Sequence, residues 1–339
     1  MKKGLFRVLL AVLLGTALLT GCTAPVNQED TSSGNSSATE STADKIKVGI
    51  VQHIDHPSLN TIRESILSEF EELGLSERVE VIYKNANGDM STLPTIMQTL
   101  VGADVDLIIP IATPTAQAAA SATTSIPIVF SAVSNPVEAG LVKAFNQTDG
   151  NITGVSNSIA IEDIMALAGQ LTPNAKSFGF VYNSGEINSV TGIERAKAYC
   201  DEHDITYEEV TITSTNDLQQ AAQSLVGKVD AFFTPNDNMV ASAMGIYCQV
   251  AEQAKMPLYV GADSMVTDGG LATVGIDYTV LGKQTAQMAA RLIGGAAISD
   301  TPVEQIAEYA KMINMDTANK IGVTIPDSLR EEFVILPQE

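Results

Sequence analysis

The chain is poor in the residue types on which several kinds of site depend. Its 339 residues contain no Trp, 3 His and 3 Cys. Zinc needs three or four converging ligands, whereas two of the histidines stand together in His53-Ile54-Asp55-His56 and His203 lies far along the chain. We therefore expect His56 and Pro57 to shape a turn, with metal binding as the alternative. The absence of Trp counts against a sugar site, since such sites often use flat aromatic platforms.

Basic residues are also scarce. The sequence has 19 Lys and Arg against 40 Asp and Glu. Without Lys2, Lys3 and Arg7, which belong to an N-terminal leader, 16 basic residues remain and the net charge is −24. Such a field disfavours a phosphate-binding surface, so we expect no nucleic-acid partner.

The motifs of several enzyme classes are missing. The sequence contains no GxSxG elbow, P-loop, HExxH, or GxGxxG after a predicted strand. Glu186 and Asp263 could form a carboxylate pair for glycoside hydrolysis, which leaves an extracytoplasmic hydrolase as an alternative. We expect no catalytic activity and no cofactor.

The N-terminus is typical of an exported lipoprotein. A basic start is followed by the apolar stretch Leu9–Leu19, which is short for a membrane span. The segment ends in Leu19-Thr20-Gly21-Cys22, which resembles the lipobox of bacterial lipoproteins. This predicts a signal peptide over 1–22, cleavage before Cys22, and acyl chains such as palmitate that tether the protein to the membrane. An ordinary signal peptide is the alternative. Residues 23–44, rich in Ser and Thr, predict a disordered tether.

From Lys45 onward the pattern alternates between short apolar runs and helical segments, which predicts an α/β fold with parallel sheets. Thr113 is a candidate N-cap with Pro114 at the first helical position, and Asn135 with Pro136 marks another candidate helix start. Residues 303–313 and 320–325 could be strands or short helices. The expected strands are 47–51, 79–83, 107–111, 126–130, 178–182, 206–211, 231–233 and 258–260, and the expected helices are 57–73, 93–100, 161–171, 190–203, 216–226, 239–255 and 281–293.

The second half of this alternation repeats the first. Val48–Gln52 corresponds to Phe178–Tyr182, and Ile126–Phe130 to Met256–Val260, both at an offset of 130 residues. The sequence therefore predicts two similar Rossmann-like lobes. We place 45–156 plus 278–296 in the first lobe and 157–277 plus 297–339 in the second. Cys200 and Cys248 lie in helical patterns and are expected to be buried, although a disulfide between them is an alternative.

Polar side chains gather in the turns that follow the strands, where ligands bind in open α/β sheets. Turns of the first lobe are neutral and rich in hydroxyl groups, which suits a carboxylate at helix N-termini. Turns of the second lobe carry acidic residues, which suit an ammonium group. Each of these residues could instead be a helix cap or a turn former. The candidates are Gln52, Thr113, Thr115, Ser131, Ser134, Asn135, Asn183, Glu186, Asn188, Ser189, Asp237, Asp263 and Tyr278.

Several motifs together resemble a known family. The runs GIVQHIDHPSLN, IATPTAQAAA, IPIVFSAVSNPVEAGLV, NITGVSN, VYNSGEINSV, FFTPNDNMV and GIDYTVLGKQTA resemble ABC-transporter substrate-binding lipoproteins of the tryptophan/tyrosine-binding type. The resemblance spans about residues 45–300. It implies a periplasmic-binding-protein type I fold, in which three crossovers join two lobes that close on the ligand by hinge motion. It also implies that Thr113, Thr115, Ser131, Ser134 and Asn135 face the ligand from one lobe, and Asn183, Glu186, Asn188, Ser189, Asp237 and Asp263 from the other.

The expected function is therefore that of a lipid-anchored, extracytoplasmic receptor for an amino acid. The resemblance implies an aromatic amino acid (Trp, Tyr or Phe) delivered to a membrane permease that a cytoplasmic ATPase drives. Phe130, Tyr182, Phe233 or Tyr278 could stack on its ring, with core packing as the alternative. A sensor or adhesin on the same fold, or a receptor for a nucleoside or sugar, are the alternative functions.

Overall fold

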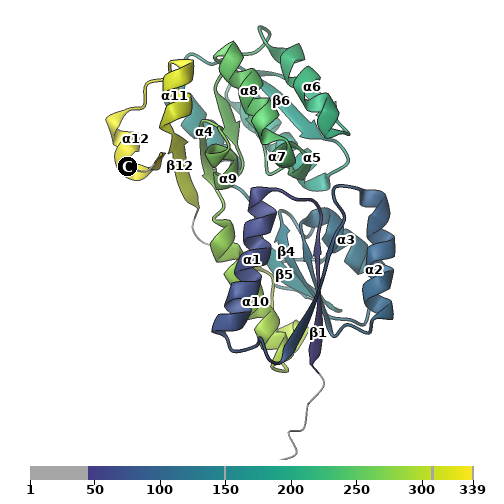
Figure 1. The fold of residues 1–339 in the computed structure, drawn as a ribbon. Coiled ribbons are helices and arrows are strands. Elements are labelled where there is room, and N and C mark those ends of the chain that lie inside the picture. The colour runs from purple at the N-terminus through teal and green to yellow at the C-terminus, as the bar shows by residue number, and fades with distance from the viewer. Residues whose placement is uncertain (1–44, 149, 307–308, 338–339) are drawn as a thin grey trace, which may run out of the picture. The chain divides into compact units, whose positions relative to one another are not determined.

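Two sheets organise the part of the chain that the computed structural model describes, which comprises residues 45–148, 150–306 and 309–337 (Figure 1). The predicted leader over 1–22, with Cys22, and the predicted tether over 23–44 lie outside the described residues.

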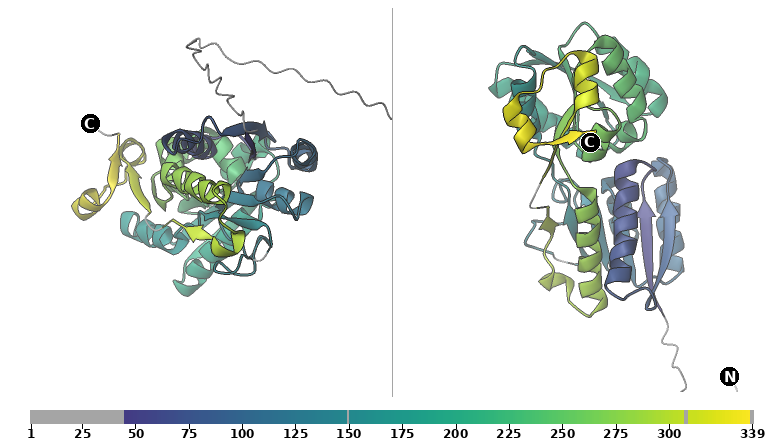
Figure 2. Two further views of the ribbon diagram at one scale, coloured as in Figure 1. Left: turned by 90° about the horizontal axis from the view of Figure 1, so that it is seen from below. Right: turned by 60° about the vertical axis from the view of Figure 1, so that its left-hand side comes forward.

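The first lobe is built on a six-stranded sheet whose order is β11-β5-β4-β3-β1-β2, parallel throughout its described strands. Helices α1 and α10 pack against each other (Figure 2), and α2 packs with α3. Val48 and Ile50 belong to a core with α1, whereas Val51 belongs to a core with α2, so the two helix pairs cover opposite faces. The elements are β1 (Ile46–Gln52), α1 (Pro57–Glu72), β2 (Val79–Asn85), α2 (Leu93–Gly102), β3 (Leu107–Ile111), α3 (Thr113–Ala122), β4 (Ile128–Val133), β5 (Ile152–Ser156), α10 (Tyr278–Ile293) and β11 (Glu304–Gln305).

The second lobe is built on a seven-stranded sheet whose order is β13-β12-β10-β9-β8-β6-β7. Among these described strands, β10 and β12 pair antiparallel and the other pairs are parallel. The elements are α4 (Ile161–Leu171), β6 (Ser177–Asn183), α5 (Ile187–Glu202), β7 (Thr206–Ile212), α6 (Leu218–Leu225), β8 (Ala231–Thr234), α7 (Asn238–Ser242), α8 (Met244–Ala254), β9 (Leu258–Val260), α9 (Asp263–Thr267), β10 (Ala272–Gly275), β12 (Ala310–Asn314), α11 (Met315–Ile321), α12 (Asp327–Glu332) and β13 (Val334–Leu336). Short 3₁₀ helices lie at Met90–Thr92, Thr215–Asp217 and Ile298–Asp300.

The predicted repeat is visible in the order of the strands. The segment β4-β3-β1-β2 of the first sheet corresponds to β9-β8-β6-β7 of the second. A repeated hydrogen bond marks the same place in both lobes: the backbone N–H of Lys47 donates to Asp106 over 2.8 Å, and that of Lys176 donates to Asp230 over 2.8 Å. The two α/β lobes with mostly parallel sheets confirm the predicted fold class.

The chain crosses between the sheets after β5, after β10, and between β11 and β12. These crossings place α10 in the first lobe. The assignment of residues 297–339 to the second lobe is wrong at Glu304 and Gln305, because β11 pairs with β5 at the edge of the first sheet. With two residues, β11 has no hydrophobic pattern of its own to indicate its sheet.

Some predicted helix ends also differ from the structure. Thr113 is the first residue of α3, and the N-cap is Ala112, whose φ is 82°. No helix begins at Pro136; instead the side chain of Asn135 accepts the backbone N–H groups of Val137 and Glu138 within a turn. The helix predicted over 239–255 is divided at Ala243 into α7 and α8.

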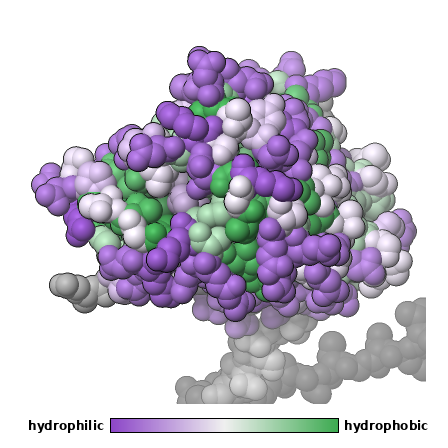
Figure 3. Space-filling view, turned by 90° about the horizontal axis from the view of Figure 1, so that it is seen from above, coloured by the Kyte–Doolittle hydropathy of each residue, from purple (hydrophilic) through white to green (hydrophobic). Residues whose placement is uncertain are grey.

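The two described cysteines do not form the disulfide that the sequence left as an alternative. Cys200 is buried, Cys248 is partly buried, and both are free thiols. Seen from above, the surface of the protein is mostly hydrophilic, and hydrophobic residues are visible between the hydrophilic ones (Figure 3).

Candidate functional site

A small cavity lies where the strand-end turns of the two lobes meet. His56, Leu59 and Ser134 line it from the first lobe, and Asn188 and Asp237 from the second. The remaining lining residues are Ser58, Ala132, Asn157, Asn236, Asn238, Ala241, Ala262, Met265 and Tyr278. The cavity measures about 10 Å³, which is no more than a single water needs. A larger ligand therefore requires the lobes to move apart.

Direct hydrogen bonds join the lobes around this cavity. The side-chain amide of Asn236 donates to the Ser134 hydroxyl over 2.8 Å, and the hydroxyl groups of Ser58 and Ser264 lie 2.5 Å apart. The structure is therefore closed across the cleft.

His56 connects this cleft to a buried carboxylate. Its Nε2 lies 3.3 Å from Oδ1 of Asn238, whose side-chain nitrogen donates to Glu186. Glu186 is fully buried and also accepts from the side-chain amides of Asn183 and Asn188 and from the backbone N–H of Met239. Burial raises the pKa of Glu186, and its neutral N–H donors oppose that rise.

Asp237 is a second buried carboxylate beside Glu186. It is the N-cap of α7, and its oxygens accept the backbone N–H groups of Asn183 (2.6 Å) and Val240 (2.8 Å). Burial and then the charge of Glu186 raise the pKa of Asp237 to about 7. For the two histidines burial acts in the opposite direction, because it disfavours the protonated ring. It lowers the pKa of His53 and of His56 to about 4, so both imidazoles are neutral at pH 7. The cleft thus combines neutral imidazoles with acidic groups.

Residues at two hinge crossings complete the cavity wall. Tyr278 begins α10 after the second crossing, and its phenol hydrogen-bonds Asn157, which follows β5 at the first crossing. Asn157 also accepts the Ser134 hydroxyl over 3.2 Å. This chain of contacts makes the position of the hinge depend on groups that line the cavity.

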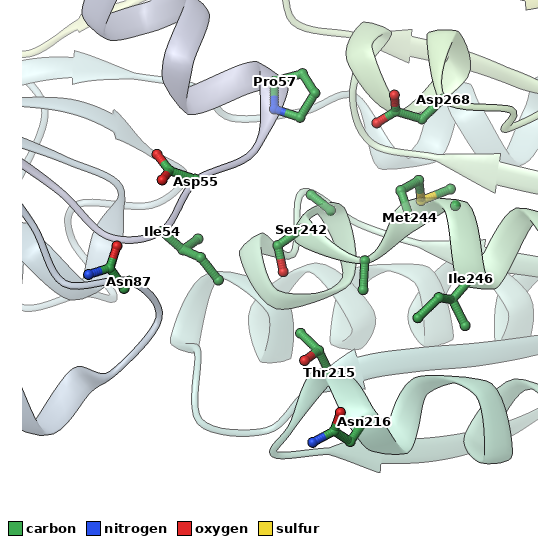
Figure 4. Close-up of a pocket in the computed structure, with 13 residues that line it drawn as sticks. Ile54, Asp55, Pro57, Asn87, Thr215, Asn216, Ser242, Met244, Ile246 and Asp268 are labelled. Carbon is green, nitrogen blue, oxygen red and sulfur yellow. The ribbon is translucent and has the colours of Figure 1, made fainter.

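A larger groove lies beside the cavity at the edge of the cleft (Figure 4). Its volume is about 790 Å³. Ile54, Asp55 and Asn87 line it from the first lobe, and the second lobe contributes residues around the break between α7 and α8, including Ser242 and Met244. Ala241 lines both the groove and the cavity, so the two spaces adjoin.

Four of the predicted ligand-binding residues line the cavity: Ser134, Asn188, Asp237 and Tyr278. Three others, all of the first lobe, make hydrogen bonds inside that lobe. Gln52 bonds Asn60 and Arg63, the Thr115 hydroxyl donates to the backbone of Ile111, and Ser131 bonds Thr285 of α10. Thr113 has a buried hydroxyl with no hydrogen-bond partner among the described residues.

The remaining predicted residues lie around the cavity without lining it. Asn183 and Glu186 bond each other, and Ser189 follows in the first turn of α5. Asp263 begins α9, and burial raises its pKa to about 6, with a further contribution from Asp277. Asn135 lines a neighbouring groove together with Asn236.

Sequence reasoning missed much of the cavity wall. The sequence predicts only a turn at His56 and gives Asn157 no role, yet both are buried there. The available signal is that Asn157 directly follows β5 and that His56 lies in the turn after β1. Of the candidate stacking residues, only Tyr278 lines the cavity; Phe130 and Phe233 are fully buried, and Tyr182 donates to Glu209.

A family model described as ABC transporter substrate binding protein matches residues 47–333. The chain belongs to this family. The members of this family are extracytoplasmic solute receptors of ABC transporters, and the family is not one of enzymes. None of the helices in the described part of the chain has the length and apolar character needed to span a bilayer. Within the same residues, no cluster of three His, Cys, Asp or Glu side chains is placed to hold a metal ion.

Relatives with stated ligands share most of their length with this chain. A tyrosine-binding protein of Clostridioides difficile is 35% identical over 95% of this chain and 93% of its own. An ABC domain from Streptococcus pneumonia, crystallised with L-Trp, is 36% identical, covers 86% of this chain and 99% of its own, and superposes with a TM-score of 0.83.

The ligand-free, open structure of a substrate-binding protein with adhesive properties from Clostridium difficile is 34% identical with the same coverage of both chains, but its TM-score is 0.66. Because identity and coverage hardly change, a different arrangement of the lobes accounts for the lower score. The present structure resembles the L-Trp complex more closely than the open form.

Proposed function

We propose that this protein is the receptor of an ABC importer for an aromatic amino acid, which it binds between its lobes by hinge closure. The observation that carries the proposal is the composition of the interlobe cavity. Polar groups that suit the two charged ends of an amino acid stand beside the apolar side chains of Leu59 and Met265 and the ring of Tyr278. The tyrosine-binding and L-Trp-bound relatives favour the same class of ligand.

Access to the site requires opening of the lobes. The closed cavity admits about one water, while the adjoining groove in Figure 4 is open at the edge of the cleft. The ligand enters from the groove when the hinge opens, and closure then forms the Ser134–Asn236 and Ser58–Ser264 contacts around it.

A thermal-shift screen of residues 45–339 against amino acids, nucleosides and sugars tests the ligand class. Ligand at 100 times its dissociation constant adds about 2.7 kcal/mol of stability, so Trp, Tyr or Phe should raise the melting temperature by several degrees. A shift with a nucleoside or sugar and none with any amino acid would refute the proposal.

The anchor is a separate part of the proposal. Leu19-Thr20-Gly21-Cys22 supports cleavage and acylation at Cys22, which would hold the receptor beside its permease. Metabolic labelling with an alkynyl palmitate tests this in the full chain. The label should be incorporated into the wild type and lost in Cys22→Ala; equal labelling of both would exclude this anchor.

Adhesion is the second candidate function. It is favoured by one observation, the adhesive properties stated for the 34%-identical relative. Binding of the purified protein to cultured host cells would test it. A two-lobed substrate-binding protein of another family serves as the control.

A further inference from the structure

Two cavity residues carry buried polar atoms that no described residue satisfies. These atoms are Nδ1 of His56 and Oδ1 of Asn188. The residues are 7% and 6% exposed, one belongs to each lobe, and both line the interlobe cavity. A buried polar atom without a partner costs about 1–3 kcal/mol, so each of them favours a ligand that supplies the missing partner.

The hydrogen bonds around Glu186 determine what kind of partner each atom needs. Glu186 accepts backbone N–H groups on both oxygens, from Met239 on one and from Asn238 on the other. Backbone N–H groups can only donate, so both oxygens of Glu186 act as acceptors, and the side-chain NH₂ of Asn238 faces the same carboxyl group as a third kind of donor. This orientation leaves Oδ1 of Asn238 toward His56.

That oxygen fixes the tautomer of the imidazole. Oδ1 of Asn238 can only accept, so the nearby Nε2 of His56 must carry the hydrogen. The ring is neutral because burial lowers the pKa of His56 to about 4. A neutral ring protonated on Nε2 has a bare Nδ1, which is a hydrogen-bond acceptor.

The free atom of Asn188 is an acceptor for the same kind of reason. Its side-chain NH₂ donates to Glu186 and to the backbone oxygen of Asn236. Its Oδ1 therefore remains as a bare acceptor on the opposite lobe. Asp237 adds a carboxylate to the same cavity wall.

We propose that His56 Nδ1 and Asn188 Oδ1 together bind the primary ammonium group of the ligand across the two lobes, and that Glu186 sets this site through Asn238 without touching the ligand. The inference rests on the proposed function and specifies it. An ammonium group offers three N–H donors, and bonding to one acceptor on each lobe couples recognition of the ligand to closure. Glu186 is in this scheme a positioning residue.

Binding of an aromatic amino acid and of its deaminated acid, measured by calorimetry on residues 45–339, tests the assignment. The wild type should prefer the amino acid by at least about 100-fold, as expected for two charge-assisted hydrogen bonds. His56→Gln keeps a donor toward Asn238 but removes the acceptor at Nδ1, and it should reduce this preference about tenfold or more. Asn188→Ala should do the same.

Thr273→Val is the matched control, because it removes a buried hydroxyl that also has no partner among the described residues but lies outside the cavity lining. The preference of Thr273→Val for the amino acid over the deaminated acid should equal that of the wild type.

If neither compound binds to the wild type or to any of the variants, the proposed function fails. If both bind to the wild type with equal affinity, the receptor function stands and the ammonium site is wrong.

The tautomer of His56 provides a second measurement, which would not change if Glu186 had a purely structural role. The chain has only 3 histidines, so nitrogen-15 NMR of labelled histidine can be assigned by single substitutions. His56 should be protonated on Nε2 in the wild type, and Glu186→Gln should populate the Nδ1-protonated form and lower the preference for the amino acid. An Nδ1-protonated His56 in the wild type would overturn the proposal.

Discussion

Asn236 in the second lobe donates a 2.8 Å hydrogen bond to the hydroxyl of Ser134 in the first. The same hydroxyl donates to Asn157 at the first hinge crossing. One serine thus connects the opposite wall of the cleft with the hinge, so its contacts exist in full only when the lobes are closed.

Ser134→Ala should weaken ligand binding mainly by destabilising closure. Loss of a hydrogen bond of this kind costs about 0.5–1.5 kcal/mol, which corresponds to roughly two- to tenfold in the dissociation constant. The dissociation rate, measured by stopped-flow fluorescence or surface plasmon resonance, should rise by most of that factor. Ser121→Ala, which removes a hydroxyl bonded within α3, is the control and should bind as the wild type does. An unchanged dissociation rate in Ser134→Ala would contradict the role in closure.

Asp237→Asn should separate binding from stability. The substitution removes negative charge from the cavity wall, and we expect affinity for an amino acid to fall about tenfold or more. The free energy of unfolding should change by only about 1 kcal/mol, because relief of the repulsion from Glu186 offsets a weakened bond to Asn183. Calorimetry and urea unfolding measure the two effects.

Asp230→Asn is the matched control for this substitution. Asp230 also accepts a backbone N–H, that of Lys176 just before β6, together with the Ser177 hydroxyl, but it lies outside the cleft. It should lose stability without losing affinity. Wild-type affinity in Asp237→Asn would show that its carboxylate does not act on the ligand.

Much of the fold was predictable because the apolar runs are long and repeat. The predicted limits of the strand Leu107–Ile111 and the helix Ile161–Leu171 coincide with β3 and α4. The two-residue strand β11 was not predictable, since its place depends on pairing with β5 and not on a pattern of its own. The break between α7 and α8 at Ala243 likewise lies within a continuous helical pattern that does not indicate it.

The site was predictable only as far as the strand ends show it. Ser134, Asn188, Asp237 and Tyr278 follow strands and line the cavity. Ser131 was expected beside them, but the register of β4 shifts between Ser131 and Val133, with Ala132 at a φ of 58°. That bulge brings Ala132 to the cavity and leaves Ser131 bonded to Thr285. Neither the bulge nor the tautomer of His56 can be derived from hydrophobic periodicity.

Gly282→Ala should destabilise the first lobe. A Cβ atom at Gly282 would lie 2.6 Å from Cβ of Ser65 and 2.7 Å from the backbone oxygen of Ile62, so α10 and α1 would have to separate. We expect a loss of about 1–3 kcal/mol in the free energy of unfolding. In Gly169→Ala, on the exposed side of α4, the new Cβ meets no atom within 4 Å among the described residues. That control should gain up to about 1 kcal/mol from helix propensity. Equal effects of the two substitutions would contradict the close approach of α1 and α10.

The buried imidazole of His56 should make stability depend on pH. Its pKa is about 4 in the folded protein and 6.5 as the ordinary value, so the unfolded chain binds the proton more readily between these values. The contribution of the neutral ring to the free energy of unfolding is therefore present above pH 6.5 and is lost as the pH falls towards 4, by up to about 3 kcal/mol.

The matched control is His56→Gln, which cannot titrate but keeps a donor for Asn238. His53, Asp237 and Asp263 also have shifted pKa values, but they remain in both proteins and cancel in the comparison. Urea unfolding at several pH values should show the wild type losing stability relative to His56→Gln as the pH is lowered from 7 to 4. Parallel curves over this range would mean that protonated His56 is accommodated in the closed cleft, and the tautomer assigned to it would lose its basis.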